Sequence, residues 1–295
     1  MTAPGERALR AVRTAAELVR APAALTVPGD SLAGAAAAGR PLGAAAPLTA
    51  LSCVALYWAG MALNDYADRN TDAVERPARP IPSGRITPGA ALALATGLTG
   101  AGIALAGAAG GPRALVVAVP LAATVWTYDL GAKRHPVAGP VTMATARALD
   151  VLAGAGYGGL RRALPAAAVI GAHTLIVSAL SSREVHGAGA GLLCATIAAT
   201  GGVTALAAAP GPHHGGLQGV TRAGALGLYA AGFAGAQATA GTHPRRVRRA
   251  VAAGIAGLLP LQAACAARAG AMPVAAGLLA GLPLTRRLFR KASPT

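Results

Sequence analysis

The sequence predicts an all-α fold: a polytopic integral membrane bundle of about nine (nine or ten) transmembrane helices. The chain of 295 residues is 54% hydrophobic and only 12% charged, whereas a soluble globular domain carries about 25% charged residues. Its apolar residues are mostly Ala and Gly, which let membrane helices approach one another closely. A soluble alanine-rich protein would need polar faces at the helical period, and the sequence lacks them.

The helices are expected from ten apolar stretches of roughly the 17–25 residues that cross a bilayer. Residues 1–20 precede them and are basic and amphipathic, which predicts an interfacial helix. The last stretch is the weakest because it is short and contains two prolines. No internal repeat is evident, so residues 1–295 are predicted to form one domain. In chain order the stretches are 21–39, 46–64, 88–109, 113–128, 138–158, 164–182, 188–209, 222–241, 249–267 and 271–285.

The Lys and Arg positions predict a multi-pass protein of the cell membrane with its N-terminus and aspartate-rich loops in the cytoplasm. If every stretch crosses the membrane, nineteen of the 26 Lys and Arg residues lie on the same side of the membrane as the N-terminus. One more lies within a span. This asymmetry is typical of the positive-inside rule. Basic loops that contact anionic lipid account for the net charge of +16, so membrane lipid is an expected partner and nucleic acid is not. The six cations on the other side are Arg40, Arg113, Arg161, Arg162, Arg222 and Arg268.

The segment "NDYADRNTDAVE" (64–75) holds four of the ten acidic residues of the chain. If the second span continues as helix, Asp65, Asp68 and Asp72 lie on one face, because residues i, i+3 and i+7 align. Three carboxylates on one face repel one another without a cation. Oxygen ligands of this kind suit Mg²⁺, which commonly bridges carboxylates and substrate phosphates. The alternative is a solvated loop whose charges only keep the chain out of the membrane.

Arginines follow the aspartates. Arg69, Arg76, Arg79 and Arg85 are suited to bind phosphate oxygens, and "RPIPSGR" then breaks the helix before the third span.

The segment "NDYADRNTDAVERPARPIPSGRI" resembles the NDxxDxxxD motif of the UbiA superfamily of intramembrane prenyltransferases. "TYDLGAKR" (127–134) is similar to the loop after the fourth helix of that family, and "ARALDVLAGA" (146–155) to its fifth helix. Together with "SREVHG" further along the chain, these segments are most similar in sequence to the EboC-like branch of the superfamily. The resemblance covers at least residues 45–190.

The resemblance implies a bundle around a central cavity, capped by two aspartate-rich loops that bind an isoprenyl diphosphate through Mg²⁺. The chain would then transfer the prenyl group to an acceptor whose identity the sequence leaves open. The resemblance assigns catalysis to Asp65, Asp68 and Asp72. These three residues and Asn64 are also the predicted metal ligands. The predicted substrate-binding residues are Asn64, Arg69, Arg79, Lys133, Arg147, Arg183, Glu184, His186, Tyr57 and Tyr128.

The second aspartate-rich motif departs from the family pattern. Relatives read like DFKSxEGD, whereas this chain reads "SSREVHGA" (181–188), with Glu184 its one carboxylate. Arg183 and His186 are expected to bind diphosphate directly as charged donors.

Other predicted residues lie in or near the spans. Tyr57 and Tyr128 are expected to face a reactive pocket, where aromatic rings stabilise a carbocation, although Trp and Tyr also favour membrane interfaces. Arg147 and Asp150 lie one turn apart in the fifth span. Ionisable groups there usually face the bundle interior, so they either form a structural ion pair or direct Arg147 toward the substrate.

Two other functions remain open. A terpene cyclase would use the same ionisation but capture the cation with an internal alkene. A catalytically impaired lipid-binding or scaffolding protein would fit the changed second motif.

Overall fold

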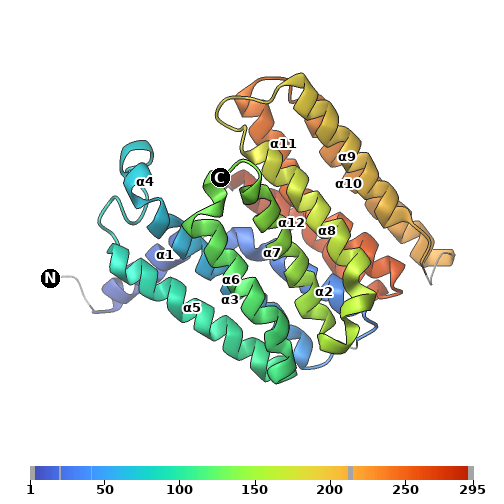
Figure 1. Cartoon of the computed structure of the whole chain (residues 1–295), viewed down its shortest axis with the longest axis horizontal. Coiled ribbons are helices and arrows are strands. Elements are labelled where there is room, and N and C mark those ends of the chain that lie inside the picture. The colour runs from blue at the N-terminus through green and yellow to red at the C-terminus, as the bar shows by residue number, and fades with distance from the viewer. Residues whose placement is uncertain (1–3, 20, 41, 212–214, 292–295) are drawn as a thin grey trace.

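The computed structural model describes residues 4–19, 21–40, 42–211 and 215–291, and all regular elements in these ranges are helices, which confirms the predicted all-α class (Figure 1). Its α-helices are α1 (Pro4–Leu18), α2 (Val27–Ala37), α3 (Ala45–Ala67), α4 (Arg69–Glu75), α5 (Pro88–Gly110), α6 (Leu115–Leu130), α7 (Ala138–Ala155), α8 (Leu160–Ser181), α9 (Ala190–Ala208), α10 (Gly216–Ala238), α11 (Pro244–Arg268) and α12 (Met272–Lys291). Four 3-10 turns join them: η1 (Ala21–Thr26), η2 (Pro112–Ala114), η3 (Ala132–Arg134) and η4 (Tyr157–Gly159).

Each of the ten predicted stretches overlaps a helix, but the count of nine or ten spans is not confirmed. Within the described residues, six helices are long and apolar enough to cross a membrane: α3, α5, η2 with α6, η4 with α8, α9 and α11. The first predicted stretch, 21–39, yields an 11-residue helix, α2, which is only about 17 Å long. It is preceded by a 3-10 turn and followed by Gly39 with a positive φ.

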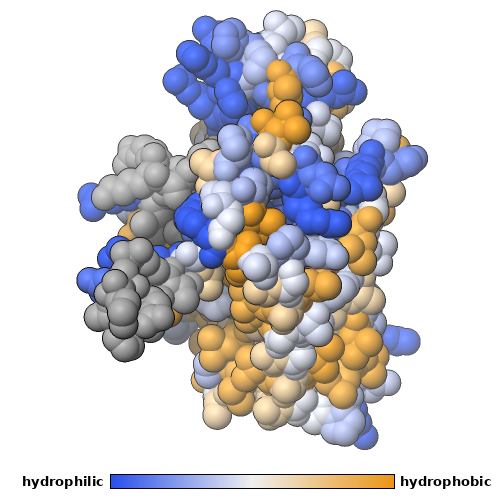
Figure 2. Space-filling model, turned by 90° about the vertical axis from the view of Figure 1, so that its left-hand side faces the viewer, coloured by the Kyte–Doolittle hydropathy of each residue, from blue (hydrophilic) through white to orange (hydrophobic). Residues whose placement is uncertain are grey.

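The surface is consistent with a membrane band. On the face drawn in Figure 2, hydrophilic side chains gather at the top, and apolar side chains dominate the lower part. Figure 1 places the short helix α4 at the same upper end. A broad apolar surface of this kind is unusual on a soluble monomer and fits the predicted multi-pass architecture.

Helices α2 and α7 pack through small residues that face one another. A side chain at Gly34 of α2 would overlap the carbonyl oxygen of Val151, and one at Gly154 of α7 would overlap the carbonyl oxygen of Ser31. Small residues at such crossings let two backbones approach closely. This contact fixes α2 against α7 and determines which buried polar groups of the two helices meet.

Substituting Gly154 by alanine is expected to lower the free energy of unfolding by about 1–3 kcal/mol. The added Cβ would overlap the backbone of Ser31, which cannot move without displacing α2. The thermal unfolding midpoint in detergent measures the effect. Gly100→Ala on α5 is the matched control, because its Cβ would meet nothing within 4 Å and alanine favours helix. Equal midpoints for the two variants would contradict the close packing of α2 on α7.

Helix α4 and the loop after it cap one end of the bundle. Gly84 turns the loop with φ 72°, and Thr87 begins α5 by accepting a hydrogen bond from the Ala90 amide at 3.2 Å. Pro88 follows at the first turn, where its missing amide proton costs nothing. The loop therefore returns the chain to the membrane and holds its arginines beside the end of α3.

Candidate active site

The predicted aspartates lie where α3 passes into α4. Helix α3 ends at Ala67 and α4 begins at Arg69. The Asp68 amide still donates to the Asn64 carbonyl at 2.9 Å, and the Asp72 amide donates to the Asp68 carbonyl at 2.8 Å. The helical hydrogen-bond spacing therefore continues through the junction, as the aspartate spacing requires.

One guanidinium joins two of the three aspartates. Arg79 Nη1 lies 3.1 Å from Asp65 Oδ1 and 2.6 Å from Asp72 Oδ2. The two aspartate side chains are only 6% and 4% exposed, so their mutual repulsion would be costly without a cation between them. The structure brings Asp65, Asp72 and Arg79 together as one cluster.

The third aspartate faces a different cation. Lys133 Nζ lies 2.8 Å from Asp68 Oδ1 and 3.9 Å from Asp129 Oδ1. Asn64 Nδ2 donates to the same Asp129 oxygen at 3.0 Å. Lys133 comes from η3, so the turn after α6 closes over the end of α3. Asn64, Asp68, Asp129 and Lys133 thus form a second cluster, in which Lys133 lies near both carboxylates.

The carboxylates are therefore divided between two cations. Among the described residues, no three His, Cys, Asp or Glu side chains are grouped closely enough to hold a metal ion by themselves. The helical face alone predicted one set of three, but Arg79 pairs with Asp65 and Asp72, whereas Lys133 pairs with Asp68.

Two of the neighbouring arginines are directed elsewhere. The Arg69 guanidinium lies 4.6 Å from the centroid of the Tyr66 ring and donates to the Tyr66 carbonyl at 2.9 Å. Arg85 donates to the carboxylate of Glu17 on α1, and this hydrogen bond holds the pKa of Glu17 below its ordinary value. Arg85 therefore connects α1 to the cap, and Arg79 is the arginine that contacts the aspartates most closely.

An apolar cavity of about 70 Å³ adjoins the second of these clusters. Asp129 belongs both to the cavity wall and to the second cluster. The cavity therefore adjoins the charged cap, by which we mean the two clusters together with α4 and the loop after it. The predicted residues Tyr57 and Tyr128 line the cavity. The remaining lining residues are Cys53, Leu56, Gly60, Met61, Leu121, Val125, Met143, Ala146, Arg147 and Asp150.

Arg147 has a different partner from the one its position suggested. Its Nη2 lies 2.8 Å from Asp30 Oδ2 on α2, and Asp150 forms no ion pair with it among the described residues. Asp30 also accepts a hydrogen bond from Gln262 Nε2 at 2.7 Å. All four side chains are buried. The structural ion pair is therefore between α2 and α7, and the interpretation of an Arg147–Asp150 pair was wrong, because a carboxylate of another helix, Asp30, pairs with the Arg147 guanidinium.

The second predicted loop lies between α8 and α9. Arg183 and His186 are exposed, whereas Glu184 is half-buried and its Oε1 has no hydrogen-bond partner among the described residues. Burial raises the pKa of Glu184 above its ordinary value, against the opposing effects of Arg248 and Arg76. Because Arg76 belongs to the segment after α4, the second loop lies within electrostatic range of the aspartate cap.

Sequence reasoning missed two carboxylates, Asp129 and Asp30. Both lie in or directly beside predicted apolar stretches, where a charge is costly and usually has a buried partner. That signal alone would have marked them as candidates. Their partners, Asn64 and Arg147, are far away in the chain and required the fold.

The UbiA prenyltransferase family matches residues 25–182 of the chain. These residues include both cation-bridged aspartate clusters and Arg147, and they end immediately before Arg183. The chain is 39% identical over 142 residues to digeranylgeranylglyceryl phosphate synthase of Methanothrix thermoacetophila, covering 47% of this chain and 50% of that protein. It is 35% identical over 143 residues to the synthase of the same name from Ignicoccus hospitalis, covering 48% and 46% respectively. The matched region thus spans half or less of these curated relatives.

Two solved structures share the fold. One, described as "Structural and mechanistic insights into the biosynthesis of Digeranylgeranylglyceryl phosphate synthase in membranes", is 17% identical with a TM-score of 0.61 and covers 89% of this chain and 99% of that chain. The other, a UbiA homolog from Aeropyrum pernix K1, is 22% identical with a TM-score of 0.65 and covers 81% and 96%. At these identities the likeness shows the fold alone. Together with the family match over more than half of the residues, it shows that this chain belongs to the UbiA prenyltransferase family.

Proposed function

We propose that the chain is a Mg²⁺-dependent intramembrane prenyltransferase that ionises an isoprenyl diphosphate and transfers the prenyl group to an acceptor. One observation supports this most strongly: the charged cap adjoins an apolar, tyrosine-lined cavity, because Asp129 belongs both to the second cluster and to the cavity wall. An isoprenyl diphosphate likewise has two parts, a highly charged head group that would suit the cap and an apolar chain that would suit the cavity.

The donor set of the cap fits Mg²⁺. This ion prefers carboxylate and amide oxygens and is usually bound through one or two carboxylates together with substrate phosphates. Asp65 and Asp72 already share one cationic group, Arg79, and they would hold the ion together with the diphosphate. A set of two carboxylates rather than three agrees with this mode of binding. When bound, the ion would neutralise negative charge on the departing diphosphate.

The cations of the cap would bind the diphosphate oxygens. Arg79 and Lys133 contact the aspartates in the structure, and each would exchange a carboxylate for a phosphate oxygen when the substrate arrives. Guanidinium and ammonium groups form short charge-assisted hydrogen bonds with phosphate. Arg183 and His186 of the second loop are exposed and are proposed to approach from the opposite side of the head group.

The bond between the first prenyl carbon and the diphosphate oxygen then breaks, and its electron pair leaves with the diphosphate. Tyr57 and Tyr128 line the adjoining cavity, and their ring faces would stabilise the allylic cation by up to about 2 kcal/mol. An acceptor nucleophile captures the cation and loses a proton. The apolar cavity wall excludes water, which would otherwise compete as the nucleophile.

Product analysis tests this proposal. Purified protein would be incubated with Mg²⁺ and isoprenyl diphosphates of increasing length, with and without an aromatic or prenylated glycerol phosphate acceptor. The second acceptor is chosen because the relatives are named digeranylgeranylglyceryl phosphate synthases. Acceptor adducts are the expected result. A released cyclic hydrocarbon would identify a terpene cyclase instead, and intact diphosphate throughout would overturn the enzymatic proposal.

The cap is proposed to face the cytoplasm of the cell membrane, as the distribution of Lys and Arg indicates. In a variant without native cysteines, Glu75→Cys at the cap is expected to react with a membrane-impermeant maleimide only after the cells are opened. Arg161→Cys, at the opposite end of the bundle, is expected to react in intact cells. Both native side chains are exposed, so access to reagent is limited only by the membrane. The reverse labelling pattern would contradict the orientation.

A further inference from the structure

A second, larger cavity of about 350 Å³ opens at the end of the bundle opposite the aspartate cap. Its wall includes Thr49 and Ser52 from the first half of α3, whereas the aspartates lie at the other end of that helix. The rest of the wall comes from the segment after α2, the end of α5, η2, the start of α6, the end of α7 and η4. The cavity therefore lies at the far end of the spans and is separate from the proposed active site. Its volume is typical of a small-ligand site.

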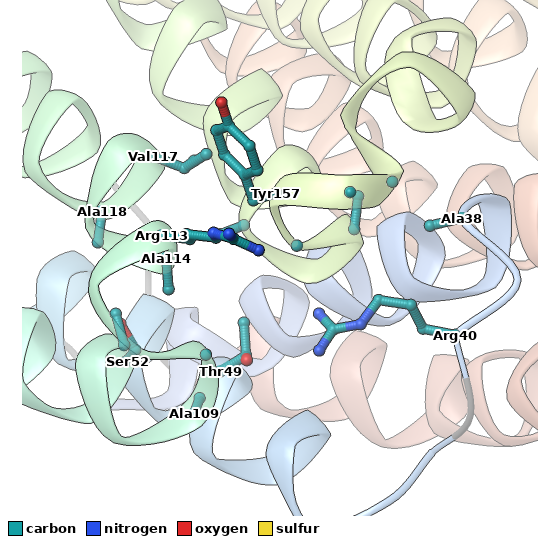
Figure 3. Close-up of a pocket in the computed structure, with 17 residues that line it drawn as sticks. Ala38, Arg40, Thr49, Ser52, Ala109, Arg113, Ala114, Val117, Ala118 and Tyr157 are labelled. Carbon is teal, nitrogen blue, oxygen red and sulfur yellow. The ribbon is translucent and has the colours of Figure 1, made fainter.

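Two arginines point into this cavity from opposite sides (Figure 3). Arg40 enters from the segment after α2 and Arg113 from η2, with their guanidinium groups directed toward one another. No lining residue is acidic. Two like charges that converge in a partly enclosed space repel one another unless an anion lies between them.

The Arg40 side chain is held in position by the protein. Its Nη1 donates to the Gly154 carbonyl at 3.0 Å. Gly156, with φ 65°, lies against the guanidinium, and a Cβ at that position would overlap Arg40 Nη1. A side chain at position 156 would therefore displace the Arg40 guanidinium from its present position. A guanidinium fixed in this way still has free N–H donors directed into the cavity.

The two hydroxyl groups that α3 contributes to the wall already donate to backbone carbonyls. Thr49 Oγ1 donates to the Ala45 carbonyl at 2.9 Å, and Ser52 Oγ donates to the Gly102 carbonyl at 2.7 Å. The Tyr157 hydroxyl is directed away from Arg40 and Arg113 (Figure 3), so the side-chain donors that face the space between them are their guanidinium groups. Planar guanidinium groups bind phosphate through paired hydrogen bonds.

The surroundings of the cavity indicate a lipid rather than a soluble anion. Val116 and Val119, on the outward side of α6, are 55% and 48% exposed, and both directly adjoin cavity residues of the same helix. In a membrane protein such a valine face contacts acyl chains. A lipid whose chains lie along α6 would have its phosphate at the depth of Arg113, the charged residue at the start of that span.

We propose that this cavity, the outer arginine cavity, binds the phosphate head group of an anionic phospholipid between Arg40 and Arg113. The site would seat a lipid at the end of the bundle opposite the active site and hold α3, α5, α6 and α7 together there. The proposal does not depend on the proposed enzymatic activity.

Native mass spectrometry of delipidated protein in detergent tests the site. The expected result is tighter binding of phosphatidylglycerol than of phosphatidylcholine, weakened about tenfold by Arg113→Gln, which removes a charge-assisted hydrogen bond. Ala109→Leu retains both arginines but fills part of the cavity, and is expected to weaken binding as well. Arg161→Gln removes an exposed arginine from the same end of the bundle without altering the wall, and is expected to bind like the wild type.

Three results would overturn the proposal. Equal losses in Arg113→Gln and Arg161→Gln would mean that the lipid responds only to surface charge. Unchanged binding in Ala109→Leu would mean that the cavity is not the site. If inorganic phosphate binds in an Arg113-dependent manner while phosphatidylglycerol does not, the site takes a soluble anion and the assignment to lipid is wrong.

Discussion

Asp65→Asn is expected to lower Mg²⁺-dependent diphosphate release by about 10²- to 10³-fold, the usual effect of removing a group that stabilises developing charge. The substitution keeps the size of the side chain but removes half of the carboxylate pair that Arg79 joins. Asp72→Asn removes the other half and is expected to have an effect of the same order. Release of diphosphate from an isoprenyl diphosphate, followed by a phosphate-coupled assay, measures both variants.

Glu75→Gln provides the matched control for these variants. Glu75 is an exposed carboxylate on α4, close in sequence to Asp72, so the variant changes the net charge of the cap by the same amount. It is expected to retain wild-type turnover and unfolding temperature. If Asp65→Asn and Asp72→Asn also turn over normally, the aspartate cap does not bind the diphosphate.

Asp30→Ala is expected to destabilise the protein by about 3–5 kcal/mol, the usual cost of leaving a buried charge without its partner. Asp30 is fully buried and forms the ion pair with Arg147, which is 7% exposed. The variant also removes one of the two acceptors of Gln262 Nε2, the other being the Thr26 carbonyl. A fall in the unfolding midpoint in detergent measures this loss.

The double variant Asp30→Ala/Arg147→Met distinguishes a structural role of Arg147 from a role in binding. It removes both charges, so most of the lost stability is expected to return. If Arg147 also contacts the substrate through the cavity that it lines, the refolded double variant stays weakly active. Recovery of both stability and turnover would assign Arg147 to helix packing alone. No recovery of stability would contradict the ion pair as the cause.

The sequence predicted those features that depend on local periodicity. Apolar stretches of membrane-spanning length marked the helices, and the spacing of Asp65 and Asp72 placed them on one side of a helix that the structure continues through Asp68. The number of spans was less secure because hydropathy does not give helix length. The first stretch is shortened by a 3-10 turn at its start and by the positive φ of Gly39 at its end.

Pairings across the bundle could not be predicted in this way. Lys133 reaches Asp68, and Arg147 reaches Asp30, only because α6 and α2 pack beside α3 and α7. Which helices adjoin is decided by contacts such as the glycine crossing of α2 and α7. A single sequence carries no direct signal for such partners. The outer arginine cavity was unrecognised for the same reason, since Arg40 and Arg113 are separated by two spans.

The most direct test is a structure of the protein with Mn²⁺, in place of Mg²⁺, and an isoprenyl thiolodiphosphate that resists ionisation. The account predicts an anomalous Mn²⁺ peak in direct contact with the Asp65 and Asp72 carboxylates and with the diphosphate. Arg79 would be turned from its present position between those carboxylates toward phosphate oxygens, and the prenyl chain would enter the cavity lined by Tyr57 and Tyr128. A diphosphate bound elsewhere, or a cap in which Arg79 still bridges the two aspartates with no metal present, would contradict it.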